Sequence, residues 1–318
     1  MSGGRITVIC GGVGAAKLLT GLVQVVPADR LTAIVNVADD MVMHGLNISP
    51  DLDTVVYTVS GQVSRERGWG LEGESWQAME MLGHYGGPDW FSLGDRDLGT
   101  HLFRTGRLAS GAPLHEVTAA IASAWGLDFT ILPVTNDPVR TMVTTVEEGE
   151  ISFQEYFVGR SHSVPVTSVR FDGATEASPA PGVLAAISDA DRIIIAPSNP
   201  AVSIDPVLAV PGVADGLRQR RDSVVAVSPI VAGKALKGPA DRLLVELGRE
   251  ASVVGVASWY RDLVGTLVVD TADRDRCNDI AELGMAAVAT NTIMSDPAVT
   301  AALAEELLAL PITGAPSP

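Results

Sequence analysis

The sequence predicts a doubly wound, Rossmann-like α/β fold with a mostly parallel sheet, and three observations support this class. Short apolar runs typical of buried strands recur along the chain, and helical patterns separate several of them. The first run passes through a glycine turn into a helix and a second strand, which makes a βαβ unit. Small, polar and charged residues follow the runs, at the strand ends where open parallel sheets bind ligands.

The βαβ unit begins close to the N-terminus. Arg5–Cys10 is the first predicted strand, and the glycines after it lead into a helix whose apolar residues recur at helical spacing. Pro27 ends that helix, and Leu31–Val37 is the second strand. Because the two strands are parallel, the connection must cross over, and we expect its helix to cover one face of the sheet.

Further predicted strands and helices continue the same alternating pattern. The remaining strands are predicted at Asp128–Pro133, Arg192–Pro197, Ser223–Ser228, Ser252–Ala257 and Val264–Asp270. Helices are predicted at Pro206–Arg218 and Ala240–Arg249.

Two stretches interrupt this pattern, and we interpret both as insertions in one Rossmann-like domain that spans residues 1–318. Residues 64–124, rich in glycine and tryptophan, form a helical and loop insertion on the substrate side. Residues 138–181 form a β-hairpin insertion, with the hairpin itself at 141–158. The core then comprises about residues 1–63, 125–137 and 182–310, and a loose tail covers 311–318.

Composition narrows the class of protein. The formal charge of -16 argues against nucleic acid or an anionic membrane as a partner, because both require clustered lysine and arginine. It leaves room for a small phosphorylated ligand, particularly with a divalent metal between carboxylates and phosphate. The 2 cysteines are too few for a disulfide framework. The chain begins without a signal-peptide pattern and has no apolar run long enough to cross a bilayer, so we expect a cytoplasmic protein.

The glycine turn after the first strand is a candidate phosphate site. Gly11, Gly12 and Gly14 allow a close backbone approach, and the helix that follows offers free N–H groups. Lys17 falls in the first helical turn, where the helix dipole disfavours a cation; a bound phosphate or simple solvent exposure would each explain it. The turn matches neither the P-loop pattern nor the full dinucleotide-binding pattern. A tight strand-to-helix turn without a ligand is the structural alternative.

Polar residues also follow the second strand. Asp39 and Asp40 are adjacent carboxylates at a strand end, which suits Mg²⁺ bridged to phosphate, although a loop or helix cap is the alternative. Asn36, just upstream, is a candidate for binding a base or ribose. The loop after the fourth strand adds the candidate nucleotide-binding residues Ser198, Asn199 and Pro200.

A helix start lies downstream of the carboxylate pair. Ser49 is predicted to cap it and Pro50 fits the first turn. Asp51 and Asp53 lie roughly 200° apart on such a helix, so both should not point at one ligand. Acidic residues in a first turn also favour the helix dipole without any ligand.

Aromatic and charged residues cluster before the next predicted helix. Trp90 lies close to Arg96 in a run of mixed charge, and a flat ring beside such charges could stack a ring-shaped substrate. Packing in the core is the alternative for each tryptophan. The 5 histidines show no metal-binding spacing.

Several strings together resemble one family, the 2-phospho-L-lactate transferases of coenzyme F-420 biosynthesis, and most closely its actinobacterial phosphoenolpyruvate transferase members. The resemblance runs nearly end to end, in the same order. Its strings are Cys10–Lys17, Asn36–Asp40, Ile48–Thr54, Leu93–Asp97, Pro197–Pro200 and Val227–Ile230.

The resemblance implies a reaction and its components. A guanosine diphosphate-activated three-carbon acid, enolpyruvyl or lactyl, would pass its phosphorylated acid to the ribityl hydroxyl of the deazaflavin Fo, releasing GMP with the help of Mg²⁺. The product would be coenzyme F-420-0 or its dehydro form. An upstream guanylyltransferase would supply the donor, and the protein would be a homodimer.

The resemblance also implies site residues. It places Fo near Asp53 and near Ser92, where other members carry a lysine, and it places the guanosine nucleotide along the glycine turn and the Ser198–Pro200 loop. With the neighbouring ring and charge, the candidate Fo residues are Asp53, Ser92, Arg96 and Trp90. Asp39 and Asp40 are the expected metal ligands, and Asp53 and Asp40 the expected catalytic residues, with Asp53 orienting the attacking hydroxyl or accepting its proton.

Two other functions fit parts of the sequence. A nicotinamide-dependent oxidoreductase would use the same βαβ unit, with Asp39 on the ribose. A non-catalytic nucleotide-sugar-binding regulator would share the glycine turn and the carboxylate pair but would lack a pocket for a flat ring.

Overall fold

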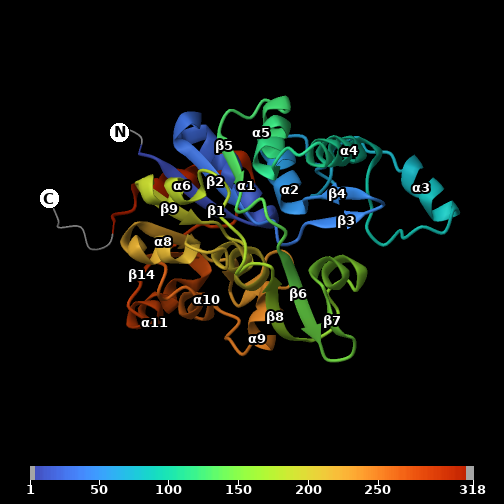
Figure 1. Cartoon of the computed structure of the whole chain (residues 1–318). Helices are drawn as coiled ribbons and strands as arrows, with labels where there is room; N and C mark the ends of the chain where they lie inside the picture. The colour runs from blue at the N-terminus through green and yellow to red at the C-terminus, as the bar shows by residue number, and fades with distance from the viewer. Residues whose placement is uncertain (1–3, 313–318) are drawn as a thin grey trace.

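A seven-stranded sheet forms the centre of the computed structural model, which describes residues 4–312 (Figure 1). All of its strand pairs are parallel. The strands, in spatial order, are β14 (Ala286–Thr290), β13 (Thr266–Asp270), β10 (Val224–Val227), β9 (Arg192–Ile195), β1 (Ile6–Cys10), β2 (Leu31–Val35) and β5 (Thr130–Pro133). The predicted α/β class is confirmed.

The central strands are apolar because helices cover both faces of the sheet. Every residue of β1, β9, β10 and β13 is buried. The chain moves outward from β1 to β2 and β5, and then returns to place β9 on the other side of β1. The strand order therefore reverses between β1 and β9, which is the position where open α/β sheets bind ligands.

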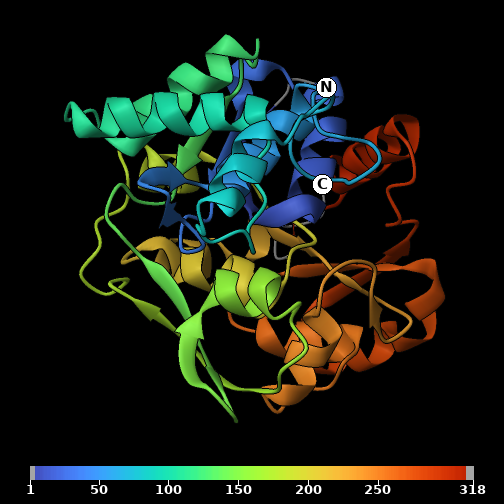
Figure 2. The ribbon, with the colours of Figure 1, turned by 90° about the vertical axis from the view of Figure 1, so that its right-hand side faces the viewer.

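The helices that flank the sheet are mostly short. They are α1 (Gly12–Val25), α2 (Pro50–Val59), α5 (Leu114–Ala124), α6 (Val183–Asp189), α7 (Asp205–Leu208), α8 (Val213–Gln219), α9 (Ala240–Glu246), α10 (Val253–Trp259), α11 (Cys277–Glu282) and α12 (Pro297–Ala309). Short 3-10 turns lie at Ala28–Arg30, Arg221–Ser223 and Thr271–Arg276, and single π-helical turns at Glu155–Gly159 and Pro200–Ile204. Helix α12, red in Figure 2, lies against the blue α1.

Smaller elements project from this core. Helices α3 (Gln77–His84) and α4 (Asp95–Ala109) extend to one side of the sheet, with the hairpin of β3 (Met41–Met43) and β4 (Leu46–Ile48) beneath them (Figure 1). A separate antiparallel sheet in the order β7-β6-β8 is formed by Gly149–Ser152, Arg140–Thr145 and Val166–Asp172. A two-stranded ribbon pairs β11 (Ile230–Val231) with β12 (Lys234–Ala235).

The strand predicted at Ser252–Ala257 is wrong, because this segment forms α10. Ser252 is its N-cap, and its side chain accepts hydrogen bonds from the backbone N–H groups of Val254 and Gly255 at 3.2 and 3.1 Å. A short apolar run fits a buried strand and a buried helix equally well, and here the N-cap decides for the helix.

Other boundaries also differ from the predictions. The helix predicted at Pro206–Arg218 is split into α7 and α8, and Gly212 between them has φ +84°. The second strand of the predicted hairpin ends at Ser152, and the chain turns into a π-helical turn before β8 completes a three-stranded sheet. The partly exposed edge strand β14 was not predicted, because its alanine-rich sequence carries a weak strand signal.

The structure describes only part of the predicted C-terminal tail. Residues 313–318 of the predicted tail lie outside the described residues, and 311–312 follow α12 without regular structure. Among residues 4–312, no helix combines the length and apolar character needed to cross a membrane.

Candidate active site

A cavity of about 850 Å³ lies at the carboxyl ends of the central strands. Loops that follow β1, β2, β9, β10 and β14 all contribute to its lining, so it spans the position where the strand order reverses. Side chains from α2, α4 and the π-helical turn at 155–159 line it as well. The cavity is large enough for two ligands of nucleotide size side by side.

Most of the candidate site residues line this cavity. They are Gly11, Gly12, Gly14, Lys17, Asp39, Asp53, Trp90, Ser92, Ser198 and Asn199. The other candidates, Asn36, Asp40, Arg96 and Pro200, are absent from its lining.

Asn36 lies behind the cavity wall instead of at its surface. Its side chain is fully buried and donates from Nδ2 to Asp51 Oδ2 at 3.0 Å. Its Oδ1 accepts from the backbone N–H of Ala38 at 2.9 Å. Both ends of the amide are therefore occupied by the protein. In this structure the Asn36 amide positions Asp51, and its expected contact with a base or ribose stays a prediction.

Arg96 and Pro200 also point elsewhere. The Arg96 guanidinium donates to the Glu72 carbonyl, and its backbone N–H donates to Glu74 at 2.8 Å, so it holds the insertion together. Pro200 is buried as the first residue of a π-helical turn. Asn199 caps that turn, because its Oδ1 accepts from the backbone N–H of Ala201 at 3.1 Å.

The positions after β1 require glycine for different physical reasons. A side chain at Gly11 would lie 2.6 Å from the Ser203 side chain, and one at Gly14 would lie 2.2 Å from the Pro197 carbonyl oxygen. These two glycines therefore allow the loop after β9 to pack on the turn, and Ser198 Oγ donates to the Gly11 carbonyl at 2.6 Å. Gly12 has φ +67° and faces open space apart from Asp51.

Lys17 lies in the second turn of α1, because the helix begins at Gly12 and not at the expected later position. Its side chain is exposed and lines the cavity. The helix dipole therefore disfavours the Lys17 charge less than the sequence suggested, because its effect falls off beyond the first turn.

A group of three carboxylates lies beside the glycine turn. Burial, followed by the charge of Asp51, raises the pKa of Asp39 well above its usual value. Burial also raises the pKa of Asp51 to about 6 and that of Asp40 to about 7. One oxygen of Asp39 and one of Asp40 are buried without a hydrogen-bond partner among residues 4–312. The other Asp40 oxygen accepts from Ser49 Oγ at 2.7 Å, so Ser49 binds Asp40 instead of capping α2.

These three carboxylates are chemically suited to a divalent cation. Within the described residues, none of them lies in ion-pairing distance of a lysine, arginine or histidine. Burial raises the pKa values of all three, Arg104 and Arg140 offset this only partly and at Asp40 alone, and a hard cation with oxygen ligands would stabilise the charged carboxylates. Asp39 and Asp51 line the cavity, whereas Asp40 does not. Asp39 and Asp51 are the pair that could hold Mg²⁺ beside a phosphate.

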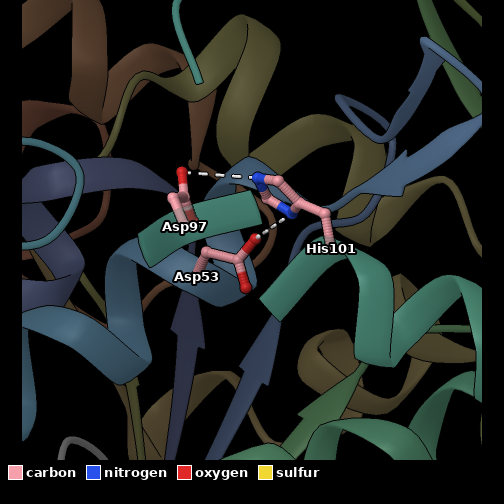
Figure 3. A group of neighbouring side chains, drawn as sticks. All are labelled: Asp53, Asp97 and His101. Carbon is pink, nitrogen blue, oxygen red and sulfur yellow. Dashed lines mark ion pairs between the residues drawn. The ribbon is translucent and has the colours of Figure 1, made fainter. Parts of the chain in front are cut away.

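A second polar group consists of Asp53 from α2 and Asp97 and His101 from α4, and Figure 3 shows the imidazole between the two carboxylates. His101 Nε2 lies 3.3 Å from Asp97 Oδ2, and His101 Nδ1 lies 3.8 Å from Asp53 Oδ2. Tyr57 donates to the other Asp97 oxygen at 2.6 Å. These ligand types could hold a metal ion.

Arg104 changes the charge balance of this group. Its fully buried guanidinium donates to Asp53 Oδ2 at 3.1 Å and also to Oδ1, and it lies 3.2 Å from His101 Nδ1. Because arginine only donates, His101 Nδ1 must accept and Nε2 carries the proton toward Asp97. Both Asp53 oxygens and His101 Nδ1 are thus engaged. This group holds one guanidinium for its two carboxylates, whereas Asp39 and Asp51 have no ion-pair partner among the described residues, so a cation fits better at Asp39 and Asp51.

An aromatic wall faces the second group. Trp90 and Phe91 pack edge to face with ring centres 5.8 Å apart, and both line the cavity with Trp69. Trp90 is 36% exposed and Trp69 is 45% exposed, so neither is a simple core residue. Flat rings at a cavity wall favour a flat ligand.

Sequence reasoning missed several residues of this site. Asp97, His101, Arg67 and Lys237 all line the cavity, and Arg104 lies behind it. Asp97 and His101 are four residues apart on one helix, which is a spacing that brings side chains together. That spacing was a usable signal. The pairing of Arg104 with Asp53 joins two helices, and no local pattern indicates it.

Comparison with known proteins identifies relatives of the whole chain. Residues 6–302 match the family described as 2-phospho-L-lactate transferase CofD. A protein of Streptomyces coelicolor named phosphoenolpyruvate transferase is 42% identical over 311 residues, covering 96% of this chain and 98% of its own. A protein of Mycobacterium avium with the same name is 42% identical over 324 residues, covering 93% and 96%.

A solved structure shares the fold. A member of the UPF0052 family from Bacillus halodurans aligns with a TM-score of 0.61 at 17% identity, covering 97% of this chain and 99% of its own. At that identity the likeness establishes the architecture alone.

Proposed function

This chain belongs to the 2-phospho-L-lactate transferase CofD family and is a transferase, and we propose that it moves a phosphorylated three-carbon acid from a guanosine diphosphate-activated donor to the deazaflavin Fo. GMP is the leaving product. The acid is enolpyruvyl phosphate or 2-phospholactate, and the relatives named phosphoenolpyruvate transferase favour the first. With the enolpyruvyl donor, the product is the dehydro form of coenzyme F-420-0.

The observation that supports this proposal is the two-part lining of one cavity. One part contains the glycine turn, Lys17 and the Ser198–Asn199 loop, which suit a nucleotide diphosphate. The other part contains Trp90, Phe91 and the Asp53 group, which suit a flat ring that carries hydroxyl groups. A non-catalytic nucleotide-sugar regulator needs the first part only.

Mg²⁺ is the proposed cofactor, held by Asp39 and Asp51. When bound, it neutralises charge on the donor diphosphate and so lowers the barrier to displacement of GMP. Asp40 lies behind these ligands, with one oxygen bound by Ser49. We place it in support of the metal site and not in contact with substrate.

The protein's own residues position the acceptor. Asp53 is buried with both oxygens bound by Arg104, so its carboxylate is a hydrogen-bond acceptor held in a fixed orientation. We therefore propose that Asp53 orients the attacking hydroxyl of Fo toward the phosphorus. Proximity and orientation of this kind supply a large share of catalysis in phosphoryl transfer.

A reconstitution tests the function. Purified protein is mixed with Fo, Mg²⁺, GTP and a guanylyltransferase, and phosphoenolpyruvate and 2-phospholactate are supplied in separate reactions. Mass spectrometry should show a gain on Fo equal to the phosphorylated acid less one water, together with GMP. No gain with either acid would overturn the proposal, and the ratio of the two gains identifies the donor.

A binding measurement tests the acceptor wall separately. Fo fluorescence should be quenched on mixing with the protein, and Trp90→Leu should weaken this binding by roughly tenfold, since stacking of one ring contributes about 1–1.5 kcal/mol. Tyr85→Leu is the control, because Tyr85 is an exposed aromatic residue absent from the cavity lining. Equal binding by both variants would remove Trp90 from the Fo site.

A further inference from the structure

Lysine is rare in this protein, and its distribution is uneven. The chain has 38 acidic residues but only three lysines, Lys17, Lys234 and Lys237. Lys17 and Lys237 line the cavity. Within residues 4–312, neither side chain makes an ion pair or a hydrogen bond. Two unpaired cations facing one cavity of a protein with a formal charge of -16 indicate an anionic ligand with more than one charged end.

Lys237 lies in the loop between β12 and α9. Its Nζ passes so close to Gly68 that a Cβ on that residue would lie 2.8 Å away. Gly68 also has φ +73°, so this position needs glycine for its backbone as well as for space. Two loops that are far apart in sequence therefore meet at the Lys237 ammonium.

Arg67 precedes Gly68 and adds a second cation to the lining of the same cavity. Its guanidinium lies 5.6 Å from the ring centre of Trp69 and 5.3 Å from that of Trp76. Its Nη2 donates to the Leu71 carbonyl at 2.8 Å, and its Nε is buried without a partner among the described residues. The guanidinium is thus held in a fixed orientation and keeps unused donors.

The acidic residues of the cavity come from other segments. Asp39 follows β2, Asp51 and Asp53 lie on α2, and Asp97 lies on α4. The segments 67–70 and 236–240 contribute no carboxylate to the lining. The two segments that carry Arg67 and Lys237 therefore bring cations and no carboxylate to the lining, and both are separate in sequence from the glycine turn.

We propose that Arg67 and Lys237 form a second anion subsite, which binds the carboxylate of the donor's three-carbon acid while Lys17 and the glycine turn bind the diphosphate. This inference rests on the proposed function. The donor carries negative charge at the diphosphate and at the carboxylate, and a guanidinium beside an ammonium is well suited to a carboxylate. The subsite would select donors that carry an acid over simple nucleotides.

Calorimetric titration in the absence of Fo tests the subsite. The probes are GDP, which lacks the carboxylate, and lactyl diphosphoguanosine, which carries it. Lys237→Met should weaken binding of the lactyl compound by about tenfold or more and change GDP binding by less than about threefold. Arg67→Lys, which keeps the charge and loses the planar fork, should show the same selectivity to a smaller extent.

Lys234→Met is the matched control, because Lys234 is the one lysine absent from the cavity lining, and it should bind both probes like the wild type. Equal losses for GDP and the lactyl compound in Lys237→Met would place Lys237 on the diphosphate and overturn the subsite, and so would unchanged binding of both. Turnover of Fo by the wild type keeps the two proposals apart. If product forms but Lys237→Met binds the lactyl compound normally, only the subsite is wrong; if no product forms and neither probe binds, both are wrong.

Discussion

Arg104 on α4 donates hydrogen bonds to both carboxylate oxygens of Asp53 on α2, across 51 residues of sequence. The pair is buried, and it joins the helix that begins beside the glycine turn to the helix that carries His101. It fixes the orientation of the Asp53 carboxylate at the cavity wall.

This relationship predicts different effects for two variants of Arg104. Arg104→Met leaves the Asp53 charge buried and unpaired, so urea unfolding should show a loss of about 3–5 kcal/mol. Arg104→Lys keeps the charge but loses the planar fork, so it should retain most stability while kcat falls by about tenfold or more with little change in KM for the donor. Arg107→Met is the control, because Arg107 is an exposed residue of the same helix. Unchanged kcat in Arg104→Lys would show that the position of Asp53 does not matter for the reaction.

The two polar groups of the cavity predict where a divalent cation binds. Asp39→Asn should weaken Mn²⁺ binding by about tenfold or more in calorimetric titration, because it removes a carboxylate whose charge has no cationic partner. His101→Gln should change Mn²⁺ affinity by less than about threefold, because the Arg104 guanidinium already places a positive charge beside His101 Nδ1 and Asp53. The reverse ranking would move the metal site to Asp53, Asp97 and His101.

The raised carboxyl pKa values predict how stability depends on pH without metal. Folding raises the pKa of Asp51 from 3.8 to about 6, so the native state binds more protons than the unfolded state between these values. Stability in EDTA should therefore fall as pH rises through this window, and Asp40, with a pKa of about 7, extends the fall toward pH 8.

Asp51→Asn removes this effect at one position. The variant should be more stable than the wild type by about 1–3 kcal/mol at pH 8 and nearly equal to it at pH 4, measured by urea unfolding in EDTA. The Asn36 hydrogen bond can persist, because an asparagine oxygen still accepts it. Asp128→Asn, at an exposed position, should show no such pH-dependent difference. A variant destabilised equally at both pH values would mean that the Asp51 charge does not oppose folding.

The glycine turn predicts a contrast between two helical glycines. Gly14→Ala should destabilise by about 1–3 kcal/mol or more, because its methyl group would meet the Pro197 carbonyl oxygen at 2.2 Å. Gly106→Ala on α4 should stabilise by about 0.5–1 kcal/mol, since nothing lies within 4 Å and alanine favours helix. Thermal unfolding of both variants measures this. A neutral Gly14→Ala would show that the loop after β9 can move away from the turn.

Local patterns determined the class of fold and the outline of the nucleotide half of the site. Strands such as β1 and β9 are buried on both faces, so they must be continuous apolar runs, and such runs are visible in the sequence. Polar residues at their carboxyl ends must then gather at one edge, which is why Gly12, Lys17 and Ser198 line one cavity as expected.

Tertiary packing decided the rest. Ser252–Ala257 could satisfy strand or helix patterns, and the N-cap that Ser252 forms in the folded chain decides for α10. Asn36 was close to the site in sequence, but burial turned its amide to Asp51. The pairing of Arg104 with Asp53 and the meeting of Lys237 with Gly68 depend on where distant segments pack, because charge pairing is set by distance in space and not by spacing along the chain. The sequence alone therefore determined the scaffold and the edge of the sheet where polar residues gather, whereas only the folded structure determined which charges in the cavity have partners within the protein.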